Sequence, residues 1–121
     1  MPPCYKDGGD HCHVVKGSDR CNALFVADTA PVLLALGAEI TLASAQGEAG
    51  LPLAEFYSGT GEPVNILGAG QVLTQVRVPA PPPRSAVVYL RHSPRRAIDF
   101  AVVGVAVVLQ VDPQDGSCTE A

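Results

Sequence analysis

The sequence contains no tryptophan, a single methionine and only 5% aromatic residues. So few aromatic side chains argue against a surface that stacks nucleic-acid bases. The first residues, MPPCYKDGG, contain no apolar core of a secretory signal. The longest apolar run, residues 101–109, is too short to cross a bilayer. We therefore expect a cytoplasmic protein with no membrane span and no nucleic-acid partner.

The composition is otherwise that of a globular protein. The 121 residues are 47% hydrophobic, which argues against disorder, and are enough for one domain or for parts of two. The net charge of −4 selects no class of partner. Residues 77–96 nevertheless contain five arginines and no acidic residue. We expect these arginines to form a solvated or subunit-facing surface, with phosphate binding as the alternative; they are Arg77, Arg84, Arg91, Arg95 and Arg96.

The first two thirds of the chain predict a mixture of loops, helices and strands. Residues 1–22 are rich in Gly, Asp and Lys and show no period, so they predict a loop. A helix is expected after Asp28, where Asp28 or Thr29 can cap, Pro31 suits the first turn and Gly37 suits the end. The other expected elements are strands over 23–26, 38–44 and 71–78, a turn at 46–47, a short helix over 53–57 and a loop over 59–70.

Four prolines within residues 79–83 predict a stiff, extended linker. Beyond it we expect a strand over 86–90, a long and almost wholly buried strand over 98–111, and a hairpin turn over 112–116. A strand pair of this kind cannot bury two faces by itself. The chain also opens inside a loop. We therefore expect a sequence that is truncated at both ends.

Three of the four cysteines, Cys4, Cys12 and Cys21, lie in the first loop. Their spacing has neither the close pairs of zinc sites nor the pattern of ferredoxins. A loop that wraps around a metal or cluster would still bring them together. Two alternatives stay open, namely unremarkable thiols and a small zinc module in which His11 or His13 joins the cysteines. Cys118 is distant in sequence and is not expected to be a ligand.

The stretch CYKDGGDHCHVVKGSDRC, followed by ADTAPVLLALGAEI, resembles the FAD-binding subunit of the xanthine dehydrogenase family of molybdenum hydroxylases. Within that family it looks most like the subfamily of 4-hydroxybenzoyl-CoA reductase beta subunits. GQVLTQVRVP and YLRHSPRRAIDFAVVGVAVVL are similar to later parts of the same subunit, so the resemblance covers nearly the whole chain.

The resemblance implies an α+β fold. It would comprise the C-terminal part of a PCMH/VAO-type FAD-binding domain, a small mixed α/β subdomain, and the first strands of a CO-dehydrogenase-flavoprotein-like C-terminal domain. The implied division is a cluster-binding loop over 1–22, the second half of the FAD-binding domain over 23–79, a proline-rich linker over 80–84 and the start of the C-terminal domain over 85–121.

The resemblance also implies cofactors. Cys4, Cys12 and Cys21 match three of four ligands to a [4Fe–4S] cluster, and the fourth cysteine would lie upstream. Asp28, Leu73 and Arg91 match FAD-binding positions, although Arg91 replaces a lysine of many relatives. The family's Gly-Gly-Asn turn and its pyrophosphate-binding loop are missing, so we expect no tight FAD binding by these residues alone. No catalytic residue is expected.

The implied function is electron transfer in an enzyme similar to 4-hydroxybenzoyl-CoA reductase, which removes the hydroxyl of an aromatic acyl-CoA. The partners would be a molybdenum-cofactor subunit and a [2Fe–2S] subunit in a heterotrimer, with dimerisation left open, and a ferredoxin-like or other electron donor. One alternative is the FAD subunit of another molybdenum hydroxylase, acting on a xanthine, an aldehyde or a heteroaromatic compound. The other is the small zinc-binding module.

Overall fold

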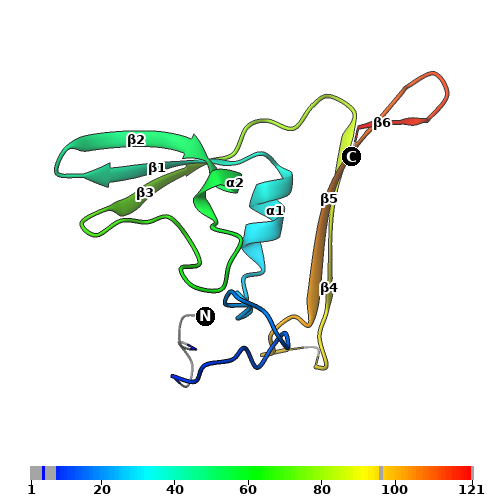
Figure 1. The fold of residues 1–121 in the computed structure, drawn as a ribbon. Coiled ribbons are helices and arrows are strands. Elements are labelled where there is room, and N and C mark those ends of the chain that lie inside the picture. Colours follow the sequence, from blue (N-terminus) through cyan, green and yellow to red (C-terminus); the bar gives the residue numbers. More distant parts are fainter. Residues whose placement is uncertain (1–3, 5–7, 96, 121) are drawn as a thin grey trace.

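Across the residues that the structure describes, the chain forms two antiparallel sheets of three strands each, and helix α1 (Thr29–Ala35) lies between them (Figure 1). The computed structural model describes residue 4, residues 8–95 and residues 97–120. The first sheet has the strand order β2-β1-β3 and the second has the order β4-β5-β6. No helix in these described ranges is long and apolar enough to cross a membrane.

The first sheet is centred on β1 (Glu39–Ser44), which pairs with β2 (Gly47–Pro52) and β3 (Val72–Arg77). The alternation in β1 and β3 predicted both strands. β2 was missed because its sequence, GEAGLP, lacks the β-branched and aromatic residues that mark strands. The predicted turn at 46–47 lies one residue earlier, at Ala45 and Gln46, and Gly47 is the first residue of β2, with a φ of 127°.

The core lies where β1 meets the short helix α2 (Leu53–Phe56). β1 contributes alternate side chains, and Ile40 is only 2% exposed. Burying a side chain of this size contributes about 1.5–3 kcal/mol. The backbone N–H of Leu53 donates to the carbonyl of Ala38 over 2.8 Å, which holds α2 beside the sheet. The buried members of the core are Ala38, Ile40, Leu42, Leu53 and Phe56.

Helix α1 (Thr29–Ala35) begins and ends where the sequence predicted. Gly37 has a φ of 64°, its N–H donates to the carbonyl of Leu34, and the N–H of Ala38 donates to that of Leu33. This pair of bonds is a Schellman C-cap, which favours glycine. The start differs in one respect, because Asp28 makes no side-chain capping bond to the helix. Its carboxylate is therefore available for other contacts.

The second sheet contains β4 (Ser85–His92), β5 (Val103–Val111) and β6 (Cys118–Glu120). The predicted strand over 98–111 starts only at Val103. Ile98 has a φ of 51°, and the Asp99 carboxylate accepts bonds from the N–H groups of Arg95 and Phe100, which makes a loop. The expected burial of this strand is also wrong, since Val103 is 53% exposed and Val105 is 48% exposed.

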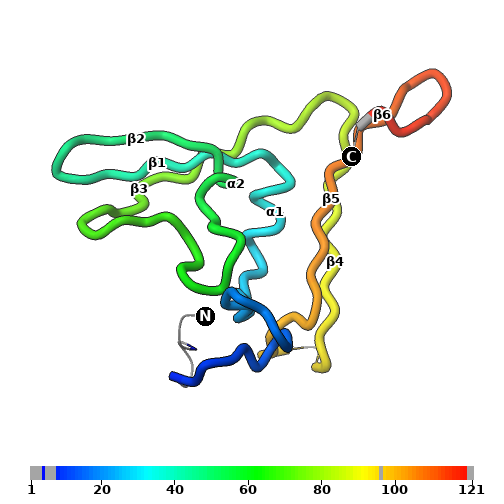
Figure 2. The backbone as a smooth tube through the Cα atoms, in the orientation of Figure 1, coloured from blue at the N-terminus to red at the C-terminus, as the bar shows by residue number. Residues whose placement is uncertain are grey.

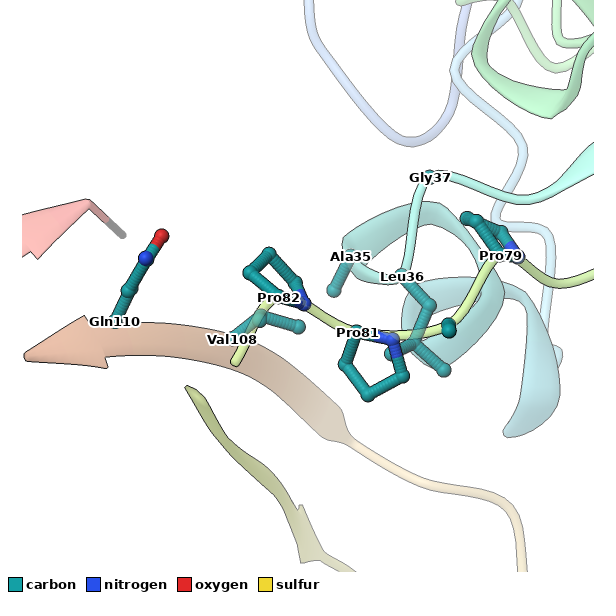
Figure 3. A pocket seen from close by; sticks show the side chains of 9 residues that line it. Ala35, Leu36, Gly37, Pro79, Pro81, Pro82, Val108 and Gln110 are labelled. Atoms are coloured by element: carbon teal, nitrogen blue, oxygen red, sulfur yellow. The ribbon is translucent and has the colours of Figure 1, made fainter. Parts of the chain in front are cut away.

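The proline linker is exposed and runs beside the end of α1 and β5 (Figure 3). Pro79, Pro81 and Pro82 line a hollow of about 360 Å³ together with the end of α1 and with Val108 and Gln110 of β5. α1 itself contacts β5. The linker therefore connects the two sheets along the helix that lies between them.

The segment before α1 is not a strand, contrary to the prediction for residues 23–26. Leu24 is 85% exposed, and the segment leads into the start of α1 (Figure 2). It lines a groove together with residues 101–104 at the start of β5. Just before this segment, the carbonyl of Cys21 accepts a hydrogen bond from the N–H of Gly61 over 2.9 Å. This bond holds the chain before α1 beside the loop after α2.

Candidate functional site

Asp28 and Arg91, two of the predicted FAD-binding residues, lie in contact. Arg91 Nε is 3.3 Å from Asp28 Oδ1. The Arg91 guanidinium also donates to the backbone carbonyl of Asp99. Asp28 comes directly before α1 and Arg91 lies on β4, so the pair forms only because α1 packs beside the second sheet.

Tyr89 belongs to the same cluster, and the sequence analysis missed it. Its hydroxyl donates to Asp28 Oδ1 over 3.1 Å, so one carboxylate oxygen meets both Tyr89 and Arg91. Burial raises the pKa of the Tyr89 phenol, and the Asp28 carboxylate raises it further. A signal was present, because residues two apart on a strand share a face, which places Tyr89 beside Arg91. We call Asp28, Tyr89 and Arg91 the Asp28 cluster.

An apolar groove of about 190 Å³ lies beside the Asp28 cluster. One wall is the segment before α1, including Phe25, and the other is Tyr89 with the start of β5. An apolar groove with a few polar groups at its edge suits a flat heteroaromatic ring. Its volume is below the roughly 300–1,000 Å³ of pockets that bury a whole small ligand. The residues present therefore fit part of a flavin, and not all of FAD.

Leu73, the third predicted FAD-binding residue, lies elsewhere. It is on β3, paired with Leu42 of β1, and it packs against the buried core. The structure therefore does not bring Leu73 together with Asp28 and Arg91. Its position explains its apolar character without a ligand, and a flavin contact for Leu73 stays a prediction.

The cysteine loop contains three partly buried free thiols, Cys4, Cys12 and Cys21. Among the residues that the structure describes, no three His, Cys, Asp or Glu side chains are placed to hold a metal ion. The His11 and His13 rings meet edge to face, with centroids 4.5 Å apart. The [4Fe–4S] ligand set and the zinc alternative thus stay predictions that the described geometry does not support.

Cys12 has the most distinctive environment of these thiols. Its sulfur accepts hydrogen bonds from the N–H of Val15 at 3.4 Å and from Asn22 Nδ2 at 3.5 Å. These bonds favour the thiolate and lower the pKa of Cys12 to about 7, with the Val15 bond the largest cause. A thiolate near neutral pH is the form that binds metals and reacts with electrophiles.

Three of the four arginines that the structure describes in the arginine-rich span face carboxylates. Arg77 pairs with Glu39, Arg91 with Asp28, and Arg95 Nε lies 3.4 Å from Asp99 Oδ2. Arg96 lies outside the described residues. Because these three arginines already face carboxylates, the span offers little charge for phosphate groups. Phosphate binding by this span stays an untested alternative.

Residues 14–81 match the family described as the FAD binding domain in molybdopterin dehydrogenase. The chain belongs to this family. Two curated relatives agree with the match. The 6-hydroxypseudooxynicotine dehydrogenase complex subunit alpha of Paenarthrobacter nicotinovorans is 34% identical over 105 residues, covering 87% of this chain and 34% of that protein. The nicotinate dehydrogenase FAD-subunit of Eubacterium barkeri is 26% identical over 104 residues, covering 85% of this chain and 35% of that protein.

Solved structures show the same similarity. Carbon monoxide dehydrogenase from Hydrogenophaga pseudoflava matches with a TM-score of 0.67 and 25% identity, over 77% of this chain and 31% of that one. Quinoline 2-oxidoreductase from Pseudomonas putida 86 matches with a TM-score of 0.63 and 28% identity, over 76% of this chain and 30% of that one. The chain thus spans about a third of the length of its relatives.

These matches confirm the predicted family and the mixed α/β fold. They do not show the finer assignment to the 4-hydroxybenzoyl-CoA reductases. The family match begins at residue 14, so it includes Cys21 but leaves out Cys4 and Cys12. The match does include Asp28 and Leu73, whereas Arg91 follows it.

Proposed function

We propose that these 121 residues are part of the FAD-binding, electron-transferring subunit of a molybdenum hydroxylase-type dehydrogenase. The observation that carries the proposal is the Asp28 cluster at the edge of an apolar groove, in a chain of this family. FAD, when bound, supplies a centre that accepts and passes on electrons between redox partners.

The protein's own task at this site is to bind and orient. The groove offers an apolar surface to one face of a ring system. The Asp28 carboxylate accepts hydrogen bonds and Arg91 donates them. Together they can bind both the N–H donors and the nitrogen or oxygen acceptors of a ring. Because the groove is smaller than the cofactor, the remaining contacts have to come from other residues or from a partner. We therefore expect the 121 residues alone to bind FAD weakly.

The partners follow from the same proposal. The relatives are named as a subunit of a complex and as an FAD-subunit, which supports assembly with other subunits. We propose a molybdenum-cofactor subunit and a [2Fe–2S] subunit in a heterotrimer, with a ferredoxin-like or other electron donor. The substrate would bind on a partner subunit.

Two candidates exist for the substrate. The resemblance of Cys4, Cys12 and Cys21 to cluster ligands of the 4-hydroxybenzoyl-CoA reductase subfamily supports a [4Fe–4S]-containing reductase of an aromatic acyl-CoA, and the thiolate character of Cys12 suits a metal ligand. The names of two relatives favour a second candidate, because nicotinate and quinoline are nitrogen heteroaromatics. Activity of the assembled complex towards 4-hydroxybenzoyl-CoA and towards nicotinate distinguishes the two.

The flavin site is tested by titrating FAD into the 121-residue chain and following flavin fluorescence. Wild type should bind weakly, and Asp28→Ala and Arg91→Ala should each lower the affinity further. Glu48→Ala and Arg84→Ala are matched controls, because both residues are exposed and lie away from the groove. Equal affinity in all five proteins would overturn the site, and tight binding by wild type would overturn the partial-site argument.

The cluster is tested separately by anaerobic reconstitution of the chain with iron and sulfide. A [4Fe–4S] cluster gives broad visible absorption that Cys12→Ser should reduce. Zinc bound in equal amount with no visible absorption would instead support the zinc module. Absence of both from the assembled complex would remove the metal proposal and leave the flavin proposal intact.

A further inference from the structure

Gly104 leaves the space in which the Tyr89 ring lies. A Cβ atom added at Gly104 would lie 2.8 Å from the Tyr89 hydroxyl oxygen, 3.3 Å from Cε2 and 3.4 Å from Cζ. The first distance is one that real Cβ atoms essentially never show. The backbone of Gly104 is not left-handed, so conformation does not explain the glycine. Space for the ring does.

This space decides where the Tyr89 hydroxyl points. Gly104 is opposite Arg91 in the β4–β5 register, two residues along from the pairing of Tyr89 with Ala106. The ring therefore leans along the sheet over Gly104, and its hydroxyl reaches Asp28 Oδ1 from the side that also holds Arg91. Tyr89 and Gly104 both line the apolar groove.

Two donors on one carboxylate oxygen fix that oxygen better than one does. The Asp28 side chain is 51% exposed, so a single ion pair in water would hold it weakly. A hydrogen bond to an ionised group is stronger than one between neutral groups, and an aromatic ring loses little rotational freedom. Tyr89 is therefore suited to restrain the carboxylate that Arg91 attracts.

We propose that Tyr89 and Gly104 are positioning residues of the flavin site: Gly104 leaves room for the Tyr89 ring, and the Tyr89 hydroxyl holds the Asp28 carboxylate at the edge of the groove. This proposal rests on the proposed function. It adds two residues that the family resemblance did not supply. Both would affect FAD binding indirectly, by fixing the position of the Asp28 carboxylate.

The first test needs no cofactor. Carbon-13-labelled tyrosine in the 121-residue chain reports the titration of the Tyr89 phenol by NMR. Gly104→Ala should bring the pKa of Tyr89 back towards its ordinary value, because the ring is displaced from Asp28. Gly50→Ala is the matched control, since Gly50 is also a strand glycine and its nearest atom would be 3.8 Å from an added Cβ. An unchanged Tyr89 titration in Gly104→Ala would overturn the proposal.

The second test is the affinity for FAD. Tyr89→Phe keeps the ring and removes the hydroxyl, and loss of one hydrogen bond corresponds to roughly a two- to tenfold fall in affinity. Gly104→Ala should show a similar fall, and Gly50→Ala none. Circular dichroism and thermal unfolding establish that each variant is folded. If Gly104→Ala fails to fold, Tyr89→Phe still tests whether the hydroxyl contributes to FAD binding.

The outcomes separate the two proposals. If Asp28→Ala weakens FAD binding while Tyr89→Phe and Gly104→Ala do not, the flavin site stands and the positioning proposal is overturned. If Gly104→Ala shifts the Tyr89 titration but no variant, Asp28→Ala included, changes FAD binding, the proposed function fails although the geometry holds. Both the shift and the loss of affinity are required to support the inference.

Discussion

Gly61 and Ala23 are packed so closely that a side chain at position 61 has no room. A Cβ atom on Gly61 would lie 2.5 Å from the backbone nitrogen of Ala23 and 2.8 Å from its carbonyl oxygen. The neighbouring bond from the Gly61 N–H to the Cys21 carbonyl keeps the two loops together. This contact joins the loop after α2 to the segment that leads into α1.

Gly61→Ala should therefore destabilise the chain. The nearest atoms belong to backbone, which cannot rotate away as a side chain can, and overpacking of this kind costs about 1–3 kcal/mol. Urea unfolding followed by circular dichroism measures the change. Gly68→Ala serves as the control, because its nearest atom would be the end of the flexible Gln71 side chain. Equal midpoints for the two variants would refute the close packing.

Ile40→Ala should cost about 2–5 kcal/mol of unfolding free energy, because Ile40 is 2% exposed in the centre of the core. Val72→Ala removes two methyl groups from a side chain of the same sheet that is 62% exposed. We expect that control to change stability by less than about 0.5 kcal/mol. Thermal and urea unfolding of both variants check the difference. A small effect at Ile40 would mean that the core lies elsewhere.

Gly37→Ala should destabilise the end of α1 by about 1 kcal/mol, since its φ of 64° is costly for residues with a Cβ atom. Gly37→Asn should cost less, because asparagine tolerates this conformation better. The order of the unfolding midpoints, wild type above Asn above Ala, is the measurement. The reverse order of Ala and Asn would argue against the Schellman cap.

Cys12 should react with iodoacetamide with a midpoint near pH 7, the value of its pKa. The thiolate is the reactive form, so the rate should rise through that pH and level off above it. Asn22→Ala removes one donor to the sulfur, so the pKa and the midpoint should both rise. Mass spectrometry of the alkylated peptides isolates Cys12. A midpoint that Asn22→Ala leaves in place would contradict the role of that bond.

The elements that the sequence predicted well are those with local causes. Pro31 and Gly37 act within α1 itself, and the alternation of β1 reflects its one buried face. The alternation of β3 also marked a strand, although within β3 only Leu73 is half-buried. β2 could not be predicted in this way, because its extended conformation depends on pairing with β1. The valines of β5 predicted a strand, but they did not predict that it starts at Val103 or that its side chains are exposed. The start depends on the loop at Asp99, and the exposure depends on whether another layer covers the sheet.

The candidate site shows the same division. The resemblance supplied Asp28 and Arg91, and the structure places them in contact. It also supplied Leu73, which packs in the core. The spacing on β4 places Tyr89 beside Arg91, but no local signal indicates its bond to Asp28, which lies 61 positions away. Gly104 has no local signal either, because its role is defined only by the ring that covers it.

The hydrogen bond between Tyr89 and Asp28 also has a consequence for folding kinetics. It joins residues 61 positions apart, across the first sheet and the proline linker. Closing so long a loop costs chain entropy, and contacts of high sequence separation form slowly. The contact between α1 and β5 spans even more sequence, so we expect the groove and its polar edge to form together with the docking of α1 on the second sheet. In a refolding reaction, the NMR signal of the Tyr89 phenol should therefore report this long-range docking step.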